Sequence, residues 1–87
     1  MAGRRSKLKC YIDTVEALSS GGPMPMSRLS LKTKINCSPL KAILSDLLGN
    51  NLVEERRTKN RTFYVATSKA RTVLSLFNQL NQIIPLV

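Results

Sequence analysis

The side chains in this sequence best suited to chemistry are its arginines and lysines, whose fixed or rotating N–H groups match phosphate oxygens. They occur in groups along the chain, and the group at residues 56–61 contains four positive charges and no acid. The groups are Arg4, Arg5, Lys7 and Lys9; Arg28, Lys32 and Lys34; and Arg56, Arg57, Lys59 and Arg61. Such grouping indicates a polyanionic partner, with nucleic acid as the first candidate and an anionic membrane surface as the second.

The residue types that usually carry out catalysis are absent or poorly placed. The 87-residue sequence has no histidine, which removes the commonest general base and most zinc sites. Glu54 and Glu55 are adjacent, so in a strand they point to opposite faces and do not form a catalytic pair. A glycine-rich phosphate loop is also missing. We therefore expect no enzymatic activity, no cofactor, no metal and no small-molecule substrate.

The two cysteines, Cys10 and Cys37, are far apart in the sequence and form no CxxC motif. This pattern favours buried, reduced thiols in an intracellular protein. A disulfide between them is an alternative that the spacing does not favour.

The overall composition indicates one small folded domain. Lys and Arg number 14 against 5 Asp and Glu, so the formal charge is +9, while 43% of the residues are hydrophobic. That balance argues against global disorder. A chain this short buries a thin core, which favours a compact helical or winged fold completed by a partner chain.

Membrane insertion and secretion are not expected. The sequence has no run of 18 apolar residues, and its basic start is followed by Lys7 and Lys9 rather than by an apolar signal core. We expect a cytoplasmic protein.

Three helices are predicted in the first part of the chain from apolar residues at steps of three and four. The first spans residues 5–19, with Ser6 as its cap and Gly21-Gly22-Pro23 after it. The second spans 27–35, preceded by a short extended stretch at 24–26. The third spans 39–49, with Ser38 as its cap and Pro39 at its first position. The residues expected to face the core are Leu8, Tyr11, Ile12, Val15 and Leu18; Leu31 and Ile35; and Leu40, Ile43, Leu44, Leu47 and Leu48.

A β-hairpin and a last helix are predicted in the second part. Two β-prone runs, 52–57 and 62–66, flank a polar, basic turn. Thr67 then caps a helix that continues to Ile84 and ends at Pro85. The apolar residues at spacings of four, three and four on this helix predict a dimer seam. They are Val73, Phe77, Leu80 and Ile84. The alternative is that this helix folds back on the core of a monomer.

The order of these elements, with the pattern Leu40-x-x-Ile43-Leu44-x-x-Leu47-Leu48-x-x-x-Leu52-Val53, a basic hairpin and then 64–69, resembles a known family. The sequence is similar to the archaeal winged helix-turn-helix family of small basic DNA-binding proteins and transcription regulators. The resemblance implies an α+β, mostly α fold of order α-α-α-β-β-α. It also implies a DNA-binding domain at 1–66 and a coiled-coil dimerisation helix at 67–87.

In such a fold the third helix enters the major groove and presents Ser38, Lys41, Ala42 and Ser45 to the bases. Only Lys41 among them is suited to a strong base or phosphate contact, so we expect modest sequence specificity. The basic residues of the second helix would flank the backbone, those of the wing would lie over a minor groove, and Arg4 and Arg5 would form an arm.

The resulting hypothesis is a homodimeric, nucleoid-associated protein that binds double-stranded DNA as a transcription regulator or chromatin-like factor. Two alternatives remain open. A winged helix can be a protein-interaction module with an acidic partner, or an RNA-binding module. The low aromatic content of 5% argues against stacking on single-stranded RNA.

Overall fold

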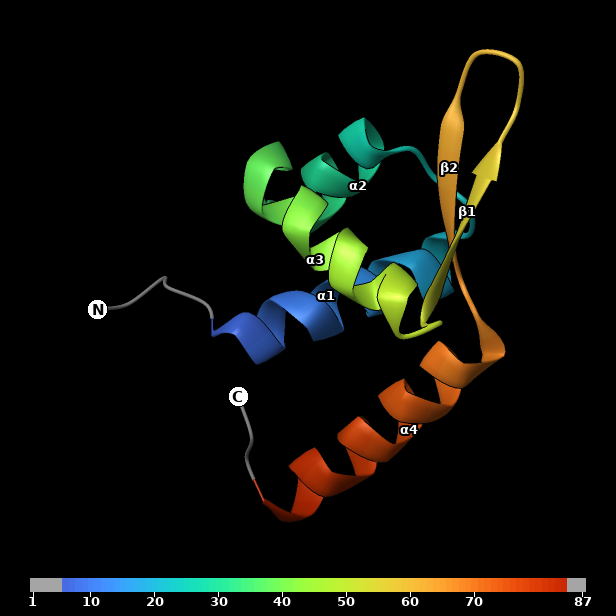
Figure 1. Cartoon of the computed structure of the whole chain (residues 1–87). Helices are drawn as coiled ribbons and strands as arrows, with labels where there is room; N and C mark the ends of the chain where they lie inside the picture. The colour runs from blue at the N-terminus through green and yellow to red at the C-terminus, as the bar shows by residue number, and fades with distance from the viewer. Residues whose placement is uncertain (1–5, 85–87) are drawn as a thin grey trace.

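The computed structural model describes residues 6–84, which form a helical body with a projecting hairpin and a diverging last helix (Figure 1). The elements are α1 (Lys7–Gly21), α2 (Met26–Thr33), α3 (Cys37–Gly49), β1 (Val53–Arg57), β2 (Thr62–Ala66) and α4 (Ser68–Ile83). The predicted order of three helices, a hairpin and a helix is therefore confirmed, as is the mostly helical α+β class.

The predicted caps of the first and last helices are confirmed. The Ser6 hydroxyl oxygen accepts a hydrogen bond of 3.1 Å from the backbone N–H of Lys9, and the Thr67 hydroxyl oxygen accepts one of 3.2 Å from Ala70. Both bonds satisfy backbone donors that have no partner within the helix. At the other end of α1, Gly22 has a φ of 76°, a left-handed backbone angle that glycine adopts without a steric penalty.

The predicted start of α3 is wrong by two residues. The helix begins at Cys37, with Asn36 rather than Ser38 at the cap position. Pro39 therefore lies within the first turn, not at its first residue. Proline is tolerated throughout the first turn, because the N–H groups there have no intrahelical acceptor in any case. A proline therefore does not identify the first residue of a helix.

The predicted second helix is also displaced, since α2 ends at Thr33 and Lys34 follows with a left-handed φ of 61°. Leu31 does not face the core as predicted: 80% of it is exposed, whereas Leu29 is fully buried. Leu29 and Thr33 are four residues apart and share the inner face of this short helix. Leu31 is two residues from each and points outward. Ile35 is buried as predicted.

The core lies between α1, α2, α3 and the base of the hairpin. Its largest buried side chains include Leu18, Met24, Leu29, Leu40 and Leu44. Val15, Ile43 and Leu47 are buried as predicted, whereas Leu8 at the start of α1 is 42% exposed. The predicted apolar face of α1 therefore enters the core only in its second half, because the first turns extend past α2.

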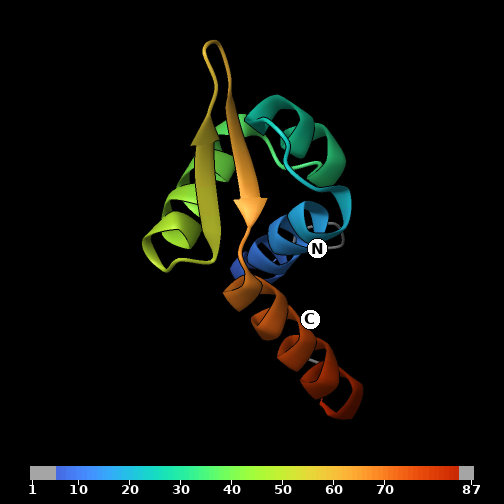
Figure 2. The same cartoon turned by 90° about the vertical axis from the view of Figure 1, so that its right-hand side faces the viewer.

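The hairpin is anchored at its base and free at its tip. β1 and β2 pair antiparallel in a register that runs from Val53 opposite Ala66 to Arg57 opposite Thr62. Met24 adds a bridge to β2, with hydrogen bonds of 3.2 and 2.9 Å to and from Tyr64, which confirms the short extended stretch before α2. Figure 2 shows the hairpin with α3 on one side and α2 on the other, and its tip projecting beyond both.

The last helix packs on the body only through its first turns. Ala70 is fully buried and Leu74 is half-buried, and α4 contacts α1 and β2 there. Beyond this point α4 runs away from the hairpin (Figures 1 and 2). Phe77 is half-buried, whereas the other apolar side chains are exposed. Leu76, Leu80, Ile83 and Ile84 are 51–77% exposed. The predicted helix end at Ile84 is confirmed, while Pro85 lies outside the described residues.

Candidate nucleic-acid interface

The outer face of α3 is formed by the residues that the sequence predicted there. Ser38, Lys41, Ala42 and Ser45 are all exposed, whereas Leu40, Ile43, Leu44 and Leu47 on the opposite side are buried in the core. This division follows from the helical repeat, because residues 38, 41, 42 and 45 recur at steps of three, one and three. The face carries one charge, that of Lys41, and three small side chains that allow close approach to another surface.

The four basic residues of the hairpin do not have equal surroundings. An Arg56 nitrogen lies 3.7 Å from a Glu54 carboxylate oxygen, and an Arg57 nitrogen lies 3.5 Å from Glu55. Each pair is two residues apart and therefore shares one face of the strand. The sequence analysis assigned all four basic residues to one positive tip and did not pair Arg56 and Arg57 with the glutamates, although the two-residue strand repeat predicts these pairs.

The uncompensated positive charge lies at the hairpin tip. Within residues 6–84, no carboxylate lies within 4 Å of Lys59 or Arg61, and both side chains are exposed. The turn that carries them is closed by a hydrogen bond of 2.8 Å from the Thr58 N–H to the Arg61 carbonyl. The tip thus presents two positive charges on a hydrogen-bonded turn.

The three basic residues of the second helix are separated by the structure. Arg28 lies with Arg61 on an open groove between α2 and β2. Lys32 instead lines a separate depression with Asp13 and Glu16 of α1. Lys34 is exposed in the turn between α2 and α3. The sequence placed these residues together because it could not assign their neighbours on other helices.

The predicted N-terminal basic arm is described only in part, because Arg4 and Arg5 lie outside the described residues. Lys9 forms an ion pair of 3.1 Å with Asp13 along α1. The Lys7 ammonium lies 5.8 Å from the centre of the Tyr11 ring, within cation–π range. Both lysines are therefore engaged on α1.

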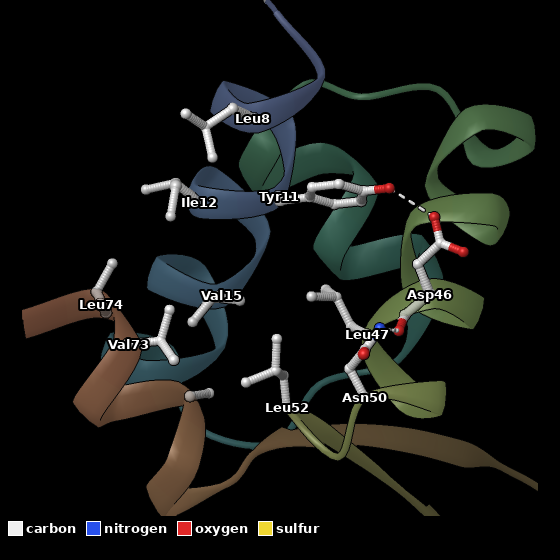
Figure 3. A pocket seen from close by; sticks show the side chains of 11 residues that line it. Leu8, Tyr11, Ile12, Val15, Asp46, Leu47, Asn50, Leu52, Val73 and Leu74 are labelled. Atoms are coloured by element: carbon white, nitrogen blue, oxygen red, sulfur yellow. Dashed lines mark hydrogen bonds between the residues drawn. The ribbon is translucent and has the colours of Figure 1, made fainter. Parts of the chain in front are cut away.

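A polar contact that the sequence did not reveal joins α1 to α3. The Tyr11 hydroxyl donates a hydrogen bond of 2.5 Å to Asp46 Oδ2 (Figure 3). This hydrogen bond, with a smaller contribution from burial, raises the pKa of Tyr11 above its ordinary value of 10.0. The two residues are 35 positions apart in the sequence, so no local pattern could have paired them.

The Tyr11–Asp46 pair lies at the edge of a mainly apolar cavity of about 320 Å³ between α1, the end of α3 and the start of α4 (Figure 3). Ile12 and Val15 of α1 face Val73 and Leu74 of α4 across it. Val73, a residue of the predicted dimer seam, therefore faces this cavity and is also partly exposed to solvent.

Burial raises the pKa of the Tyr64 hydroxyl on β2, and the nearby Glu55 adds to the increase while Arg57 opposes it. Tyr64 thus lies on the same face of the hairpin as the Glu55–Arg57 pair, in agreement with the strand register.

The prediction that both cysteines are buried is wrong. Both thiols are free, but Cys10 is half-buried and Cys37 is exposed. Cys37 is the first residue of α3, where the helix emerges from the turn outside the core. Among residues 6–84 no group of three or more potential ligand residues is placed to hold a metal ion. None of the described helices is both long enough and apolar enough to cross a membrane.

No protein-family model and no curated protein matches this chain. Solved structures do match it. BpsR from Bordetella bronchiseptica, whose DNA binding is regulated by 6-hydroxynicotinic acid, aligns with a TM-score of 0.79 at 12% identity over 95% of this chain. Oxidised MarR from E. coli aligns with a TM-score of 0.74 at 14% identity over 90% of it. The transcriptional regulator BldR from Sulfolobus solfataricus aligns with a TM-score of 0.67 at 25% identity over 88% of it.

The chain has the winged helix-turn-helix fold. In this fold α2 and α3 form the helix-turn-helix, and the β1–β2 hairpin is the wing. These neighbours are regulators rather than enzymes. The chain spans 59% of the BpsR chain, 55% of the MarR chain and 62% of the BldR chain.

Proposed function

We propose that this chain binds double-stranded DNA and acts as a transcription regulator or chromatin-like protein. The observation that carries the proposal is the exposed, nearly uncharged face of α3 beside a wing whose tip bears the unpaired charges of Lys59 and Arg61. Small polar side chains allow a helix to enter the major groove, and free cations at a wing contact the neighbouring backbone or minor groove. The regulators of similar structure, including one described by its DNA binding, support the same assignment.

The proposed contacts fall into two classes. Ser38, Lys41, Ala42 and Ser45 face the base edges, with Lys41 as the strongest contact to guanine or phosphate. The phosphates are contacted by the wing and by the cations beside it. These are Lys59 and Arg61 first, then Arg56 and Arg57, followed by Arg28, Lys32 and Lys34 and by Arg4 and Arg5 of the proposed N-terminal arm. Because most of these contacts are to the backbone, binding is tight with modest sequence specificity.

The experiment is a gel-shift titration of one duplex at 50 and 200 mM salt. If six to ten phosphates are neutralised, affinity falls by about 10³–10⁵ between these salts. The variant Lys59→Ala/Arg61→Ala weakens the fall, whereas Arg71→Ala on α4, which also removes a positive charge, does not. A flat salt response, or equal effects of the two variants, contradicts the proposal. Structured RNA as a competitor tests the RNA-binding alternative directly.

We propose further that the chain acts as a homodimer through α4. Val73, Phe77, Leu80 and Ile84 form the core of the proposed seam, and three of them are at least 40% exposed. Burying such side chains against a second α4 removes apolar surface from water at about 25 cal/mol per Å². The dimer carries two recognition helices and so favours a palindromic site. Residues 67–87 are then the dimerisation helix of a DNA-binding domain at 1–66.

The residue pattern also supports a narrower proposal about the group of proteins and the place in the cell. We propose that the protein belongs with the small basic archaeal winged-helix proteins and is nucleoid-associated in the cytoplasm. The high positive charge of +9 and the few base-reading side chains on α3 support this assignment.

A further inference from the structure

A second surface feature shares only Arg28 and Arg61 with the proposed DNA contacts. An open groove runs between α2 and β2, with Pro23, Pro25 and Phe63 along it. Leu31 also lines it and is 80% exposed, the largest exposed fraction among the large hydrophobic residues that the structure describes. Leu31, Phe63 and the two prolines together give the groove an apolar side, and a contiguous apolar surface of this kind is typical of a binding site.

The groove is formed by α2, the segment that precedes it and β2. Phe63 and its cross-strand partner Arg56 share one face of the hairpin. Tyr64, the next residue of β2, lies on the other face and is buried in the core. α3 contributes no lining residue to the groove. A molecule in the groove therefore contacts α2 and β2 and leaves the exposed face of α3 free.

The charge of the groove is positive. Arg28 from α2 and Arg61 from the wing line it, and none of its lining residues is acidic. The acids of α1 nearest to α2, Asp13 and Glu16, belong to the separate depression that holds Lys32. Two guanidinium groups beside an apolar floor match a ligand that combines carboxylates with an apolar side chain.

The backbone of the groove is well defined before any ligand arrives. Pro23 and Pro25 flank Met24, whose main chain is hydrogen-bonded in both directions to Tyr64. Proline restricts its own φ and carries no N–H, so this wall has little freedom to lose on binding. A rigid wall with an exposed apolar anchor suits an extended or helical peptide segment.

We propose that this groove binds an acidic segment of a protein partner, with one large apolar side chain of that segment seated against Leu31 and Phe63. Duplex DNA offers the negative charge but no large apolar group, so the exposed leucine favours a protein ligand. The inference goes beyond DNA binding and does not depend on it.

The test measures the fluorescence anisotropy of the full chain with two short labelled peptides, one of alternating Glu and Leu and one of alternating Glu and Ser. The Glu–Leu peptide is expected to bind more tightly. Leu31→Ser is expected to weaken its binding by about tenfold or more, since burial of one leucine is lost. Leu8→Ser is the matched control, because it removes an exposed leucine from a different helix, α1. It is expected to leave binding unchanged.

Duplex DNA binding by the same variants separates this proposal from the proposed function. Leu31→Ser is expected to bind duplex DNA like the original chain, whereas Arg28→Ala weakens the Glu–Leu peptide more than it weakens DNA. Equal binding of the two peptides, or no effect of Leu31→Ser on the Glu–Leu peptide, overturns the proposal. A loss of DNA affinity in Leu31→Ser as large as the loss of peptide affinity also overturns it, because the groove would then be part of the DNA interface.

Discussion

The hydroxyl of Tyr11 and the carboxylate of Asp46 are joined by a hydrogen bond of 2.5 Å that links α1 to α3. Charge-assisted hydrogen bonds of this kind are stronger than neutral ones and are directional. The bond lies at the edge of the apolar cavity between α1 and α4, so it fixes α3 relative to the helix on which α4 packs. It therefore connects the proposed DNA-reading element to the proposed dimerisation element.

This bond predicts a specific pH dependence of stability. The pKa of Tyr11 is raised in the folded protein above 10.0, mainly because its protonated hydroxyl donates to Asp46. Its contribution is therefore fully present below pH 10 and is lost as pH rises through the folded pKa. Tyr11→Phe is expected to lower the melting temperature at pH 7. The difference between the two proteins should shrink above pH 10.

Thermal unfolding followed by circular dichroism at pH 7, 9 and 11 measures this difference. Ser45→Ala, which removes a hydroxyl from the exposed face of α3, serves as a control for a neutral loss. A constant difference between the Tyr11→Phe variant and the original chain across this pH range would contradict the assigned role of the hydroxyl.

The wing predicts opposite effects from its arginines and its glutamates. Arg61 has no ion pair among residues 6–84, so Arg61→Ala should reduce the slope of log K against log salt by about 1 and weaken all duplex sequences alike. Glu54→Gln/Glu55→Gln frees Arg56 and Arg57 from carboxylates and should raise DNA affinity at low salt. The gain is expected at low salt because exposed ion pairs are weak, so DNA phosphates readily replace the carboxylates as partners of the arginines.

Gel-shift titrations on several duplexes measure both effects, with Arg57→Ala tested alongside. A loss confined to one duplex sequence would show that the wing reads bases rather than phosphates. Unchanged affinity in the double glutamine variant would show that the two pairs do not compete with DNA.

Substitutions of Leu29 and Leu31 are expected to have very different effects on stability, although the two residues are only two positions apart. Leu29 is fully buried, so Leu29→Ala should destabilise the fold by about 2–5 kcal/mol. Leu31 is 80% exposed, so Leu31→Ala should change the free energy of unfolding by no more than about 0.5 kcal/mol. Urea denaturation of the two variants tests whether Leu29 rather than Leu31 lies on the inner face of α2. Similar losses of unfolding free energy in the two variants would contradict this assignment.

The exposed part of α4 predicts a change of oligomeric state. Leu80→Glu and Ile84→Glu each place a charge in the proposed seam and should convert a dimer to a monomer in sedimentation experiments. Gln79→Glu adds the same charge at an exposed polar position of the same helix and should leave the dimer intact. The first turns of α4 remain packed through Ala70, so the fold should persist. A monomeric original chain would contradict the proposed seam.

Much of the fold was predictable because it depends on local rules. The apolar repeat of α3, the caps at Ser6 and Thr67 and the hairpin register all arise from residues close together in the sequence. The inner face of α2 was predicted wrongly, because an eight-residue helix contains too few turns to define it. The start of α3 was predicted wrongly because proline is tolerated at more than one position of the first turn. The exposed face of α3 followed directly from its buried face.

The sequence by itself determined the positive charge, the order of the elements and which side of α3 is free, since composition and helical periodicity are properties of the chain alone. Only the tertiary structure decided which cations have an ion pair among residues 6–84 and that Tyr11 pairs with Asp46. It also decided that Arg28 and Arg61 line one groove while Lys32 lines a depression with acids of α1. These relationships join residues from separate elements, and the packing of the core, not any local pattern, sets the distances between such elements.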